Sequence, residues 1–384
     1  MPRPMKPDYN GGSIVNLMAS IAKHYGVSTG YPTLHSLPPS QLQKKTVLVI
    51  IDGMGYDFLR EHGKDTFLAQ HIRTSMTSVF PPTTAAAITT FYTGVAPQQH
   101  GYTGWFMNLK EAGGVHTILR FTPWTDGTSL AELGFSTKKV LGVKPLSDRM
   151  RITSAAINPS YLVDTAYTKY VVGRSKQYGA KNTPGPKGIG PLFKSAHAAL
   201  RHARYVTVYW DWLDHTMHEN GYSHMTVRKH LRAIDDAFKK FVVSCKDTTI
   251  IVTADHGQMM STRAIHLVDH PALAHCLALP LSGEPRAAYC HVRAHKTGEF
   301  LRYVKTHLSK YCTVVRSDKL IKDGWYGLGK QHPFLEHRVG DYVLIMKEGY
   351  AIYDRPHGER RAHIGNHGGV SREEMLVPLI IVQT

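Results

Sequence analysis

The fold class is decided by the stretch Thr46-Val47-Leu48-Val49-Ile50-Ile51, which runs directly into Asp52-Gly53-Met54-Gly55. Apolar and β-branched side chains occupy nearly every position of the first six residues, so the stretch predicts a strand that is buried on both faces. Such strands are typical of parallel sheets that are covered by helices. Ligands of these sheets bind beyond the carboxyl ends of the strands, and Asp52 lies at that end of this strand.

Further strands and helices follow along the chain. Three more runs have the same buried character, at residues 205–210, 248–253 and 376–382. Pro378 has no backbone N–H, so the last run predicts an edge strand or a bulge. Patterns with helical spacing precede and separate the strands, at residues 11–26, 193–203 and 225–244. Strands that alternate with helices predict an α/β fold with a central, mostly parallel sheet flanked by helices.

The length of 384 residues leaves room for one large core and an insertion. We expect residues 1–43 to form an N-terminal helix and a linker. The core is predicted to comprise residues 44–258 together with 340–384. We interpret residues 259–339 as an inserted cap subdomain and the Gly- and Lys-rich segment 165–192 as a long surface loop.

The composition excludes several classes of protein. Hydrophobic residues make up 42% of the chain, which is too many for a disordered protein. No run of about 18 apolar residues exists, which excludes a membrane-spanning helix. The four cysteines lack C-x-x-C spacing, and no apolar segment follows the N-terminus as it does in a secretory signal. Both features predict a cytoplasmic protein with reduced thiols.

The charge of the chain bears on its partners. The formal net charge is +17, which favours an anionic ligand. The basic residues are scattered rather than gathered in one tract, so they support polynucleotide binding only weakly. The sequence leaves the oligomeric state open.

Candidate chemistry is carried by segments that combine Asp, His and Thr. They contain Asp52, the pair Thr83 and Thr84, Asp211 with Asp214 and His218, Asp255 with His256, and His363 with His367. Mixed carboxylate and imidazole ligands suit zinc and, in part, manganese. Asp214 and His218 are four residues apart, so on a helix they would share one face and could chelate one ion.

Thr83 and Thr84 lie where a helix is expected to begin. Pro81 and Pro82 precede an Ala-rich helical stretch, and the free N–H groups of a helix N-terminus favour an anion. A threonine hydroxyl is a weak nucleophile at neutral pH, but metal coordination would ionise it. Two ions would also clamp the attacking and leaving oxygens of a phosphoryl group.

Taken together and in this order, the motifs resemble the alkaline phosphatase superfamily, and most closely its type I phosphodiesterase/nucleotide pyrophosphatase branch. The resemblance covers residues from about 44 to 258 and from about 340 to the end. It is carried by Asp52-Gly53, the Thr84 segment that leads to Thr93-Gly94, Pro97 with His100-Gly101, Asp214 to His218, Asp255-His256-Gly257, and His367-Gly368-Gly369. It implies an alkaline-phosphatase-like sandwich with a central, mostly parallel sheet and an inserted cap subdomain.

The resemblance also implies roles for single residues. Asp52, Thr84, Asp255 and His256 would hold one divalent metal ion, and Asp214, His218 and His367 would hold the other; Zn²⁺ is favoured, with Mn²⁺ as the alternative. Thr84 would attack phosphorus and become a covalent phospho-threonine, which water activated at the other metal would hydrolyse. The family places the nucleophile nine positions before the Thr of the Thr-Gly pair, which selects Thr84 and leaves Thr83 as its alternative. Asp211 and His363 are the alternatives to Asp214 and His367.

Two positions depart from the nucleotide pyrophosphatase pattern. Ala85 replaces an aromatic residue that stacks on the nucleobase, and Trp105 replaces an Asn that binds a phosphate oxygen. Asn108 is the candidate substitute for that Asn. Tyr209 matches the second aromatic residue of the base clamp, and Trp105 is a further candidate for stacking on a ring.

The resemblance therefore predicts a two-metal hydrolase of phosphodiester or phosphoanhydride bonds, with an anionic phosphate ester, such as a nucleotide, as its substrate. Two alternatives remain open. The same metal site would serve a phosphomonoesterase or a phosphonate hydrolase. A non-catalytic anion-binding protein would keep the fold without turnover, although it would have no need for a complete set of ligands.

Overall fold

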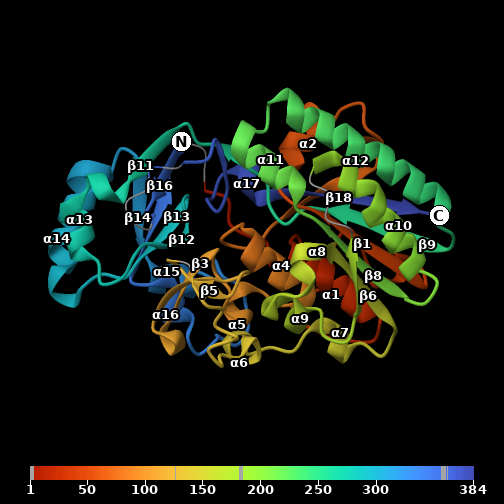
Figure 1. The fold of residues 1–384 in the computed structure, drawn as a ribbon, viewed down its shortest axis with the longest axis horizontal. Coiled ribbons are helices and arrows are strands. Elements are labelled where there is room, and N and C mark those ends of the chain that lie inside the picture. The colour runs from red at the N-terminus through yellow and green to blue at the C-terminus, as the bar shows by residue number, and fades with distance from the viewer. Residues whose placement is uncertain (1–3, 126, 181–184, 356–359, 361) are drawn as a thin grey trace.

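The structure is a computed structural model that describes residues 4–125, 127–180, 185–355, 360 and 362–384. Two seven-stranded sheets form its framework, and they lie side by side in Figure 1. The first sheet has the strand order β2-β18-β9-β1-β8-β6-β7. Its strands are β1 Lys45–Ile51, β2 Ile72–Thr77, β6 Ser154–Pro159, β7 Lys176–Ala180, β8 Tyr205–Trp210, β9 Thr248–Thr253 and β18 Leu376–Gln383.

The first sheet is mostly parallel, as the sequence predicts. β1 pairs in parallel with β8 on one side and with β9 on the other, and six of its seven residues are buried. β18 is the antiparallel member and lies between β2 and β9. Pro378 is therefore not at an edge, and the prediction of an edge strand is wrong. The alternative of a bulge is confirmed, because the register with β2 shifts between Leu379 and Ile380.

Helices cover both faces of the first sheet. In Figure 1, α2 Tyr56–His62 and α12 Met225–Ser244 lie above it, and α1 Ile14–His24 and α4 Thr84–Thr93 lie below it. α12 shows why such helices form. Its apolar side chains recur every three or four residues and are buried, whereas lysines and arginines occupy the positions between them; the buried residues include Val227, Leu231, Ile234, Phe238 and Phe241.

The segment 165–192 is not the long surface loop that its composition predicts. It contains α9 Ala166–Val171, the strand β7 at the edge of the first sheet, and the start of α10 Ile189–Ala199. β7 carries polar side chains because an edge strand faces solvent and is protected from further pairing by lysine. Residues 181–184 lie outside the described part of the chain.

The second sheet is antiparallel in all its pairings and has the order β14-β15-β13-β12-β3-β4-β5. Its strands are β3 Phe106–Leu109, β4 Gly114–Thr117, β5 Thr122–Pro123, β12 Ser282–Glu284, β13 Ala287–Cys290, β14 Cys312–Arg316 and β15 Tyr342–Met346. They come from two separate parts of the chain. The sheet thus crosses the boundaries of the predicted cap, 259–339, and the division into domains stays a prediction.

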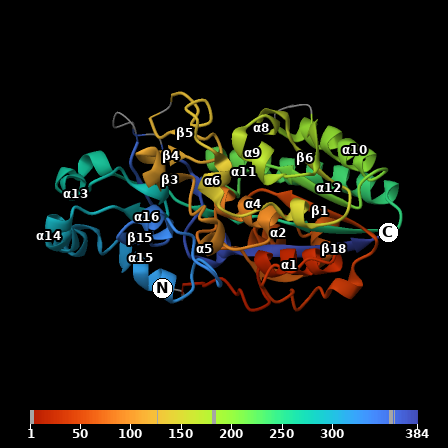
Figure 2. The same ribbon diagram turned by 90° about the horizontal axis from the view of Figure 1, so that it is seen from below.

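A buried ion pair connects the two halves of the molecule, the first half being built on the first sheet and the second half on the second sheet. Arg286, between β12 and β13, donates from Nε to Glu374 Oε1 at 2.6 Å and from Nη2 to Oε2 at 3.0 Å. Glu374 belongs to α17 Arg372–Met375, which leads directly into β18 of the first sheet. Both side chains are almost completely buried. Figure 2 shows the two halves from a second direction. β18, the strand that follows α17, lies in the first half, which also holds α1.

Two predictions from composition can be compared with the described residues. None of their helices is long and apolar enough to cross a membrane. All four cysteines are buried as free thiols, and three of them, Cys276, Cys290 and Cys312, pack in one apolar cluster beside the second sheet.

Candidate metal centre and its cavity

The sheet topology brings the predicted metal ligands together. β8, β1 and β9 are adjacent and parallel, so their carboxyl ends lie at the same edge of the first sheet. Asp52 follows β1 directly, and Asp255 and His256 follow β9. Asp214 and His218 lie one turn apart in α11 Trp212–Asn220, which begins just after β8. This is the edge at which ligands of such sheets bind.

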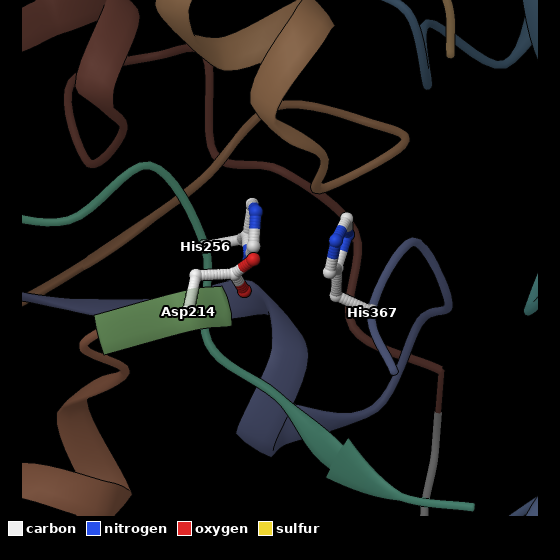
Figure 3. A group of neighbouring side chains, drawn as sticks. All are labelled: Asp214, His256 and His367. Atoms are coloured by element: carbon white, nitrogen blue, oxygen red, sulfur yellow. The ribbon is translucent and has the colours of Figure 1, made fainter. Parts of the chain in front are cut away.

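Two groups of buried side chains form at this edge. Asp52, Asp255 and His256 offer ligand atoms that all lie within 4.8 Å of one another, and so do Asp214, His256 and His367. His256 Nε2 lies 3.3 Å from both Asp52 Oδ1 and Asp255 Oδ2. Figure 3 shows the second group, with the Asp214 carboxylate close to the His256 ring. The rings of His256 and His367 stack with their centroids 3.8 Å apart.

The three histidines are oriented by the backbone. Nδ1 of His218 donates to the carbonyl of Gly365 at 2.7 Å, Nδ1 of His256 to the carbonyl of Gly257 at 3.0 Å, and Nδ1 of His367 to the carbonyl of Pro82 at 3.2 Å. A carbonyl can only accept, so each Nδ1 carries a proton, and in the neutral form of each ring Nε2 is bare and free to bind a metal. Hydrogen bonds of this kind fix the tautomer and orientation of histidines that bind metals.

The carboxylates at this edge fit a cation. Burial, followed by the neighbouring Asp255 and Asp214, raises the pKa of Asp52 well above its ordinary value. Among the described residues, no hydrogen-bond donor reaches the buried Asp52 Oδ1 or Asp255 Oδ2. Other donors hold the second oxygens, because Tyr209 donates to Asp52 Oδ2 at 2.5 Å and the Gly53 N–H to Asp255 Oδ1 at 3.2 Å. Oxygen and nitrogen ligands without thiolate suit Zn²⁺ or Mn²⁺.

The pKa values of His367 and His218 shift in opposite directions. Burial would lower the pKa of His218, but the charge of Asp214 outweighs burial and raises it. Burial, reinforced by His256, lowers the pKa of His367 well below its ordinary value, so its ring is neutral and able to bind a metal. Burial would raise the pKa of Asp214, but the charge and the hydrogen bond of protonated His218 outweigh this effect and lower it. Asp214 Oδ2 lies 3.0 Å from His218 Nε2, as the four-residue spacing on a helix predicts.

Thr84 and Thr83 face different partners. Thr84 is the first residue of α4, and its Oγ1 lies 3.3 Å from Nε2 of His256, the residue that the two ligand groups share. Thr83 is the N-cap residue of α4, with an extended backbone, and its hydroxyl donates to Glu284 Oε1 at 2.5 Å. Only Thr84 of the two thus presents its hydroxyl to the candidate metal groups.

A cavity of about 490 Å³ opens in front of these residues. Among the predicted residues, Asp52, Thr84, Asp214, His218, His367, Trp105 and Tyr209 line it. Asp255 and His256 lie behind this wall, fully buried. The structure therefore gathers all seven predicted metal ligands, and it places both Trp105 and Tyr209 beside them. Tyr209 is buried against Asp52, so its hydroxyl orients a candidate ligand as well as lining the cavity.

The alternative residues Asp211 and His363 also line the cavity but belong to neither ligand group. Asp211 accepts a hydrogen bond from the hydroxyl of Tyr161, and burial raises its pKa to about 7. The His363 ring lies 4.8 Å from that of His218, centroid to centroid.

The structure does not bring Asn108 to the cavity. Its side-chain amide donates to the carbonyl of His337 at 3.0 Å and thereby links β3 to α16 Leu335–Val339. The same side-chain amide would be needed to bind a phosphate oxygen, and this hydrogen bond already occupies it. The prediction that Asn108 replaces the missing Asn therefore finds no support in its position.

Several residues of the site were missed by sequence reasoning. Gln258 donates to Asp214 Oδ1, and its place two residues after His256 was the available signal. Arg120, Tyr161, Glu284 and Arg355 line the cavity but stand in no motif with the ligands. Glu284 is buried, and this burial raises its pKa to about 7. It reaches the site only because the second sheet packs against the first, which no local pattern predicts.

Comparisons with known proteins agree with this geometry. The model of the type I phosphodiesterase/nucleotide pyrophosphatase family matches residues 46–370. No curated protein is a significant match to the sequence. Murine ectonucleotide pyrophosphatase/phosphodiesterase 5 shares the fold, with a TM-score of 0.64 and 18% identity over 87% of each chain.

Two further solved structures share the fold. An inactive variant of that murine protein in complex with AMP gives a TM-score of 0.65 at 17% identity, again over 87% of each chain. Phosphonoacetate hydrolase from Sinorhizobium meliloti 1021, in complex with phosphonoformate, gives a TM-score of 0.64 at 14% identity. The match covers 88% of this chain and 90% of the hydrolase chain. The family model covers most of this chain, and the fold agrees with it. The chain therefore belongs to the type I phosphodiesterase/nucleotide pyrophosphatase family.

Proposed function

We propose that the protein is a two-metal-dependent hydrolase of phosphodiester or phosphoanhydride bonds that works through a covalent phospho-threonine at Thr84. One observation carries the proposal: Thr84 Oγ1 lies 3.3 Å from His256 Nε2, where the two candidate ligand groups meet. Asp52, Asp255, His256 and Thr84 would hold one ion and Asp214, His218 and His367 the other. Two Zn²⁺ ions, or Mn²⁺ as the alternative, would neutralise charge on the phosphoryl group and favour the ionised threonine.

The chain's own residues supply the remaining parts. Thr84 provides the attacking oxygen, and its position at the start of α4 places it beside the free N–H groups of the first helical turn. These N–H groups and the helix dipole stabilise negative charge on a phosphoryl oxygen. The backbone carbonyls that hold His218, His256 and His367 keep each Nε2 directed at the site.

The substrate is proposed to be a small phosphate ester. The cavity of about 490 Å³ admits a molecule of nucleotide size, and the aromatic residues Trp105 and Tyr161 line it. Solved relatives bind AMP in one case and phosphonoformate in the other. Ala85 in place of an aromatic residue removes one base contact that the family resemblance implies, so a phosphomonoester or a phosphonate is the second candidate substrate.

The first experiment compares bis-p-nitrophenyl phosphate with p-nitrophenyl phosphate, each with added Zn²⁺ or Mn²⁺ and with EDTA. A strong EDTA-sensitive preference for the diester supports the proposal, and a preference for the monoester supports the alternative. Metal binding without turnover of esters or phosphonates would indicate a non-catalytic anion-binding protein.

A pair of matched variants tests the nucleophile. Thr84→Ala removes the attacking oxygen, and we expect it to lower kcat by about 10³-fold or more while both metals still bind. Thr83→Ala is the control, with an expected loss that is far smaller. Loss of activity in the Thr83 variant alone would reverse the assignment.

A further inference from the structure

The buried carboxyl group of Glu284 joins three parts of the molecule that are distant in sequence. Glu284 ends β12, and its Oε1 accepts hydrogen bonds from Thr83 Oγ1 at 2.5 Å and from the backbone N–H of Trp105 at 2.6 Å. Its side chain lines the cavity next to the candidate metal groups. The second sheet therefore reaches the residue that precedes the proposed nucleophile.

Close backbone packing allows this reach. A Cβ atom on Gly104 would lie 2.6 Å from Gly283 Cα, so the chain before Trp105 and the chain before Glu284 touch. A Cβ on Gly368 would likewise lie 2.5 Å from Glu284 Cβ. The Glu284 side chain is thus packed closely by the Trp105 segment and by the loop that carries His367, and it has little freedom to leave Thr83.

The hydrogen bond to Glu284 changes what Thr83 can do. Thr83 occupies the N-cap position of α4, where a threonine side chain commonly accepts a hydrogen bond from the backbone N–H two or three residues later. Its backbone is suitably extended, yet its side chain makes no capping bond. Its hydroxyl donates to Glu284 instead. The N–H groups of the first turn of α4 are consequently left open for a ligand.

We propose that Glu284 is a positioning residue: it holds the Thr83 hydroxyl away from the N-terminus of α4. This keeps the N–H groups of the first turn free for a phosphoryl oxygen and leaves Thr84, rather than Thr83, with its hydroxyl at the metal groups. The inference rests on the proposed function, because it assumes that Thr84 receives the phosphoryl group. It assigns a role in the reaction to a residue of the second sheet.

The test uses Glu284→Ala, Glu284→Gln, Thr83→Val and the double variant Glu284→Ala/Thr83→Val in the full-length, metal-loaded protein. Glutamine keeps a carbonyl oxygen that accepts both hydrogen bonds, and we expect its kcat to stay within about threefold of the wild type. Alanine releases the Thr83 hydroxyl, and we expect kcat to fall by at least about tenfold, because small misplacements at a reacting centre have effects of this size or greater.

The double variant separates positioning from a merely structural role. Valine has the shape of threonine without its hydroxyl, so Thr83→Val removes the competing group. We expect Glu284→Ala/Thr83→Val to recover most of the activity that Glu284→Ala loses. A double variant as poor as Glu284→Ala, or a glutamine variant as poor as the alanine variant, would overturn the inference. Glu284→Leu keeps most of the side-chain volume and replaces the alanine variant if that protein does not fold.

Acid-quenched, trypsin-digested samples give a second readout. In the wild type the trapped phosphoryl group is expected on Thr84 alone, and in Glu284→Ala a measurable share is expected on Thr83. If Thr84→Ala keeps full activity, the proposed function fails. If Thr84→Ala is inactive while Glu284→Ala is fully active and labelled only on Thr84, the inference about Glu284 fails and the proposed function stands.

Discussion

The two sheets contribute to the site in different ways. The first sheet is mostly parallel, and its strand ends and following helices carry the candidate metal ligands Asp52, Asp214, Asp255 and His256. The second sheet is antiparallel and contributes the facing wall of the cavity, including Phe106 and Glu284. The candidate metal ligands are thus concentrated at the first sheet, whereas the second sheet adds one wall of the cavity and none of these ligands. Each sheet can be altered separately, and each alteration should change a different measurable quantity.

The largest effect is expected from Asp52→Asn on the first sheet. We expect kcat to fall by about 10³-fold, because the charge that would hold a cation is lost. Burial and the neighbouring carboxylates raise the pKa of Asp52 in the folded state, so its ionised form destabilises the metal-free protein at neutral pH. The metal-free variant should therefore have a higher Tm than the metal-free wild type, and it should gain less from added Zn²⁺.

Thermal unfolding with and without Zn²⁺, together with steady-state kinetics, measures both quantities. Asp236→Asn, an exposed carboxylate on α12, is the control and should change neither. An Asp52→Asn variant that keeps its turnover would show that this ligand of the first sheet is not needed for catalysis. The two sheets would then not differ in the way described.

The next effect concerns the connection between the sheets. Glu374→Ala leaves Arg286 buried without its bidentate partner, and removing one member of a buried pair costs about 3–5 kcal/mol of unfolding free energy. Urea denaturation measures the loss. The exposed pair Arg316 and Asp318 gives the control, since Asp318→Asn is expected to cost far less because water screens the pair. Equal losses in the two variants would mean that the buried pair does not hold the halves together.

A smaller effect is expected when the pH changes, because a buried histidine in the first half of the molecule alters the free energy of unfolding. His230 in α12 is fully buried, accepts a hydrogen bond from Trp210 Nε1 at 3.1 Å, and has a pKa lowered to about 4 by burial. Below pH 6.5 the unfolded chain binds a proton that the folded chain excludes, so stability is complete above pH 6.5 and falls as the pH drops toward 4. The loss over this window is about 3 kcal/mol.

His230→Gln keeps an acceptor for Trp210 and removes the titration. We expect its unfolding free energy to fall less than that of the wild type between pH 6.5 and 4, as measured by urea denaturation at several pH values. Parallel slopes for the two proteins would contradict the assignment of the proton to His230.

The smallest effect is expected from a substitution in the cavity wall beside the second sheet, and it concerns KM. Trp105→Ala removes a ring from the cavity wall but no candidate metal ligand. We expect KM to rise by about three- to tenfold with kcat nearly unchanged, which matches the loss of about 1 kcal/mol of aromatic contact. A fall in kcat of the size expected for Asp52→Asn would show that the two sheets do not divide binding and chemistry.

Sequence alone could predict what is encoded locally. The apolar run Thr46–Ile51 predicts β1, and the four-residue step from Asp214 to His218 predicts their shared helix face. It could not predict properties that depend on distant neighbours. β7 has the composition of a loop because it is an edge strand, and Pro378 lies in an interior strand whose register shifts beside it. Glu284 and Asn108 have positions set by the packing of β12 and β3, which no periodicity reveals.

The position of β18 has a consequence for the order in which the protein can fold during synthesis. β18 is the last of the seven strands of the first sheet to leave the ribosome, yet it lies between β2 and β9 rather than at an edge. Until it emerges, β9 exposes an unpaired side that another chain could join, and β2 has no strand partner in the sheet. His367 is also made late, so a nascent chain that lacks residues 367–383 has neither a closed sheet nor a complete set of candidate ligands. Synthesis itself therefore delays the active protein until almost all of the chain described here has been released.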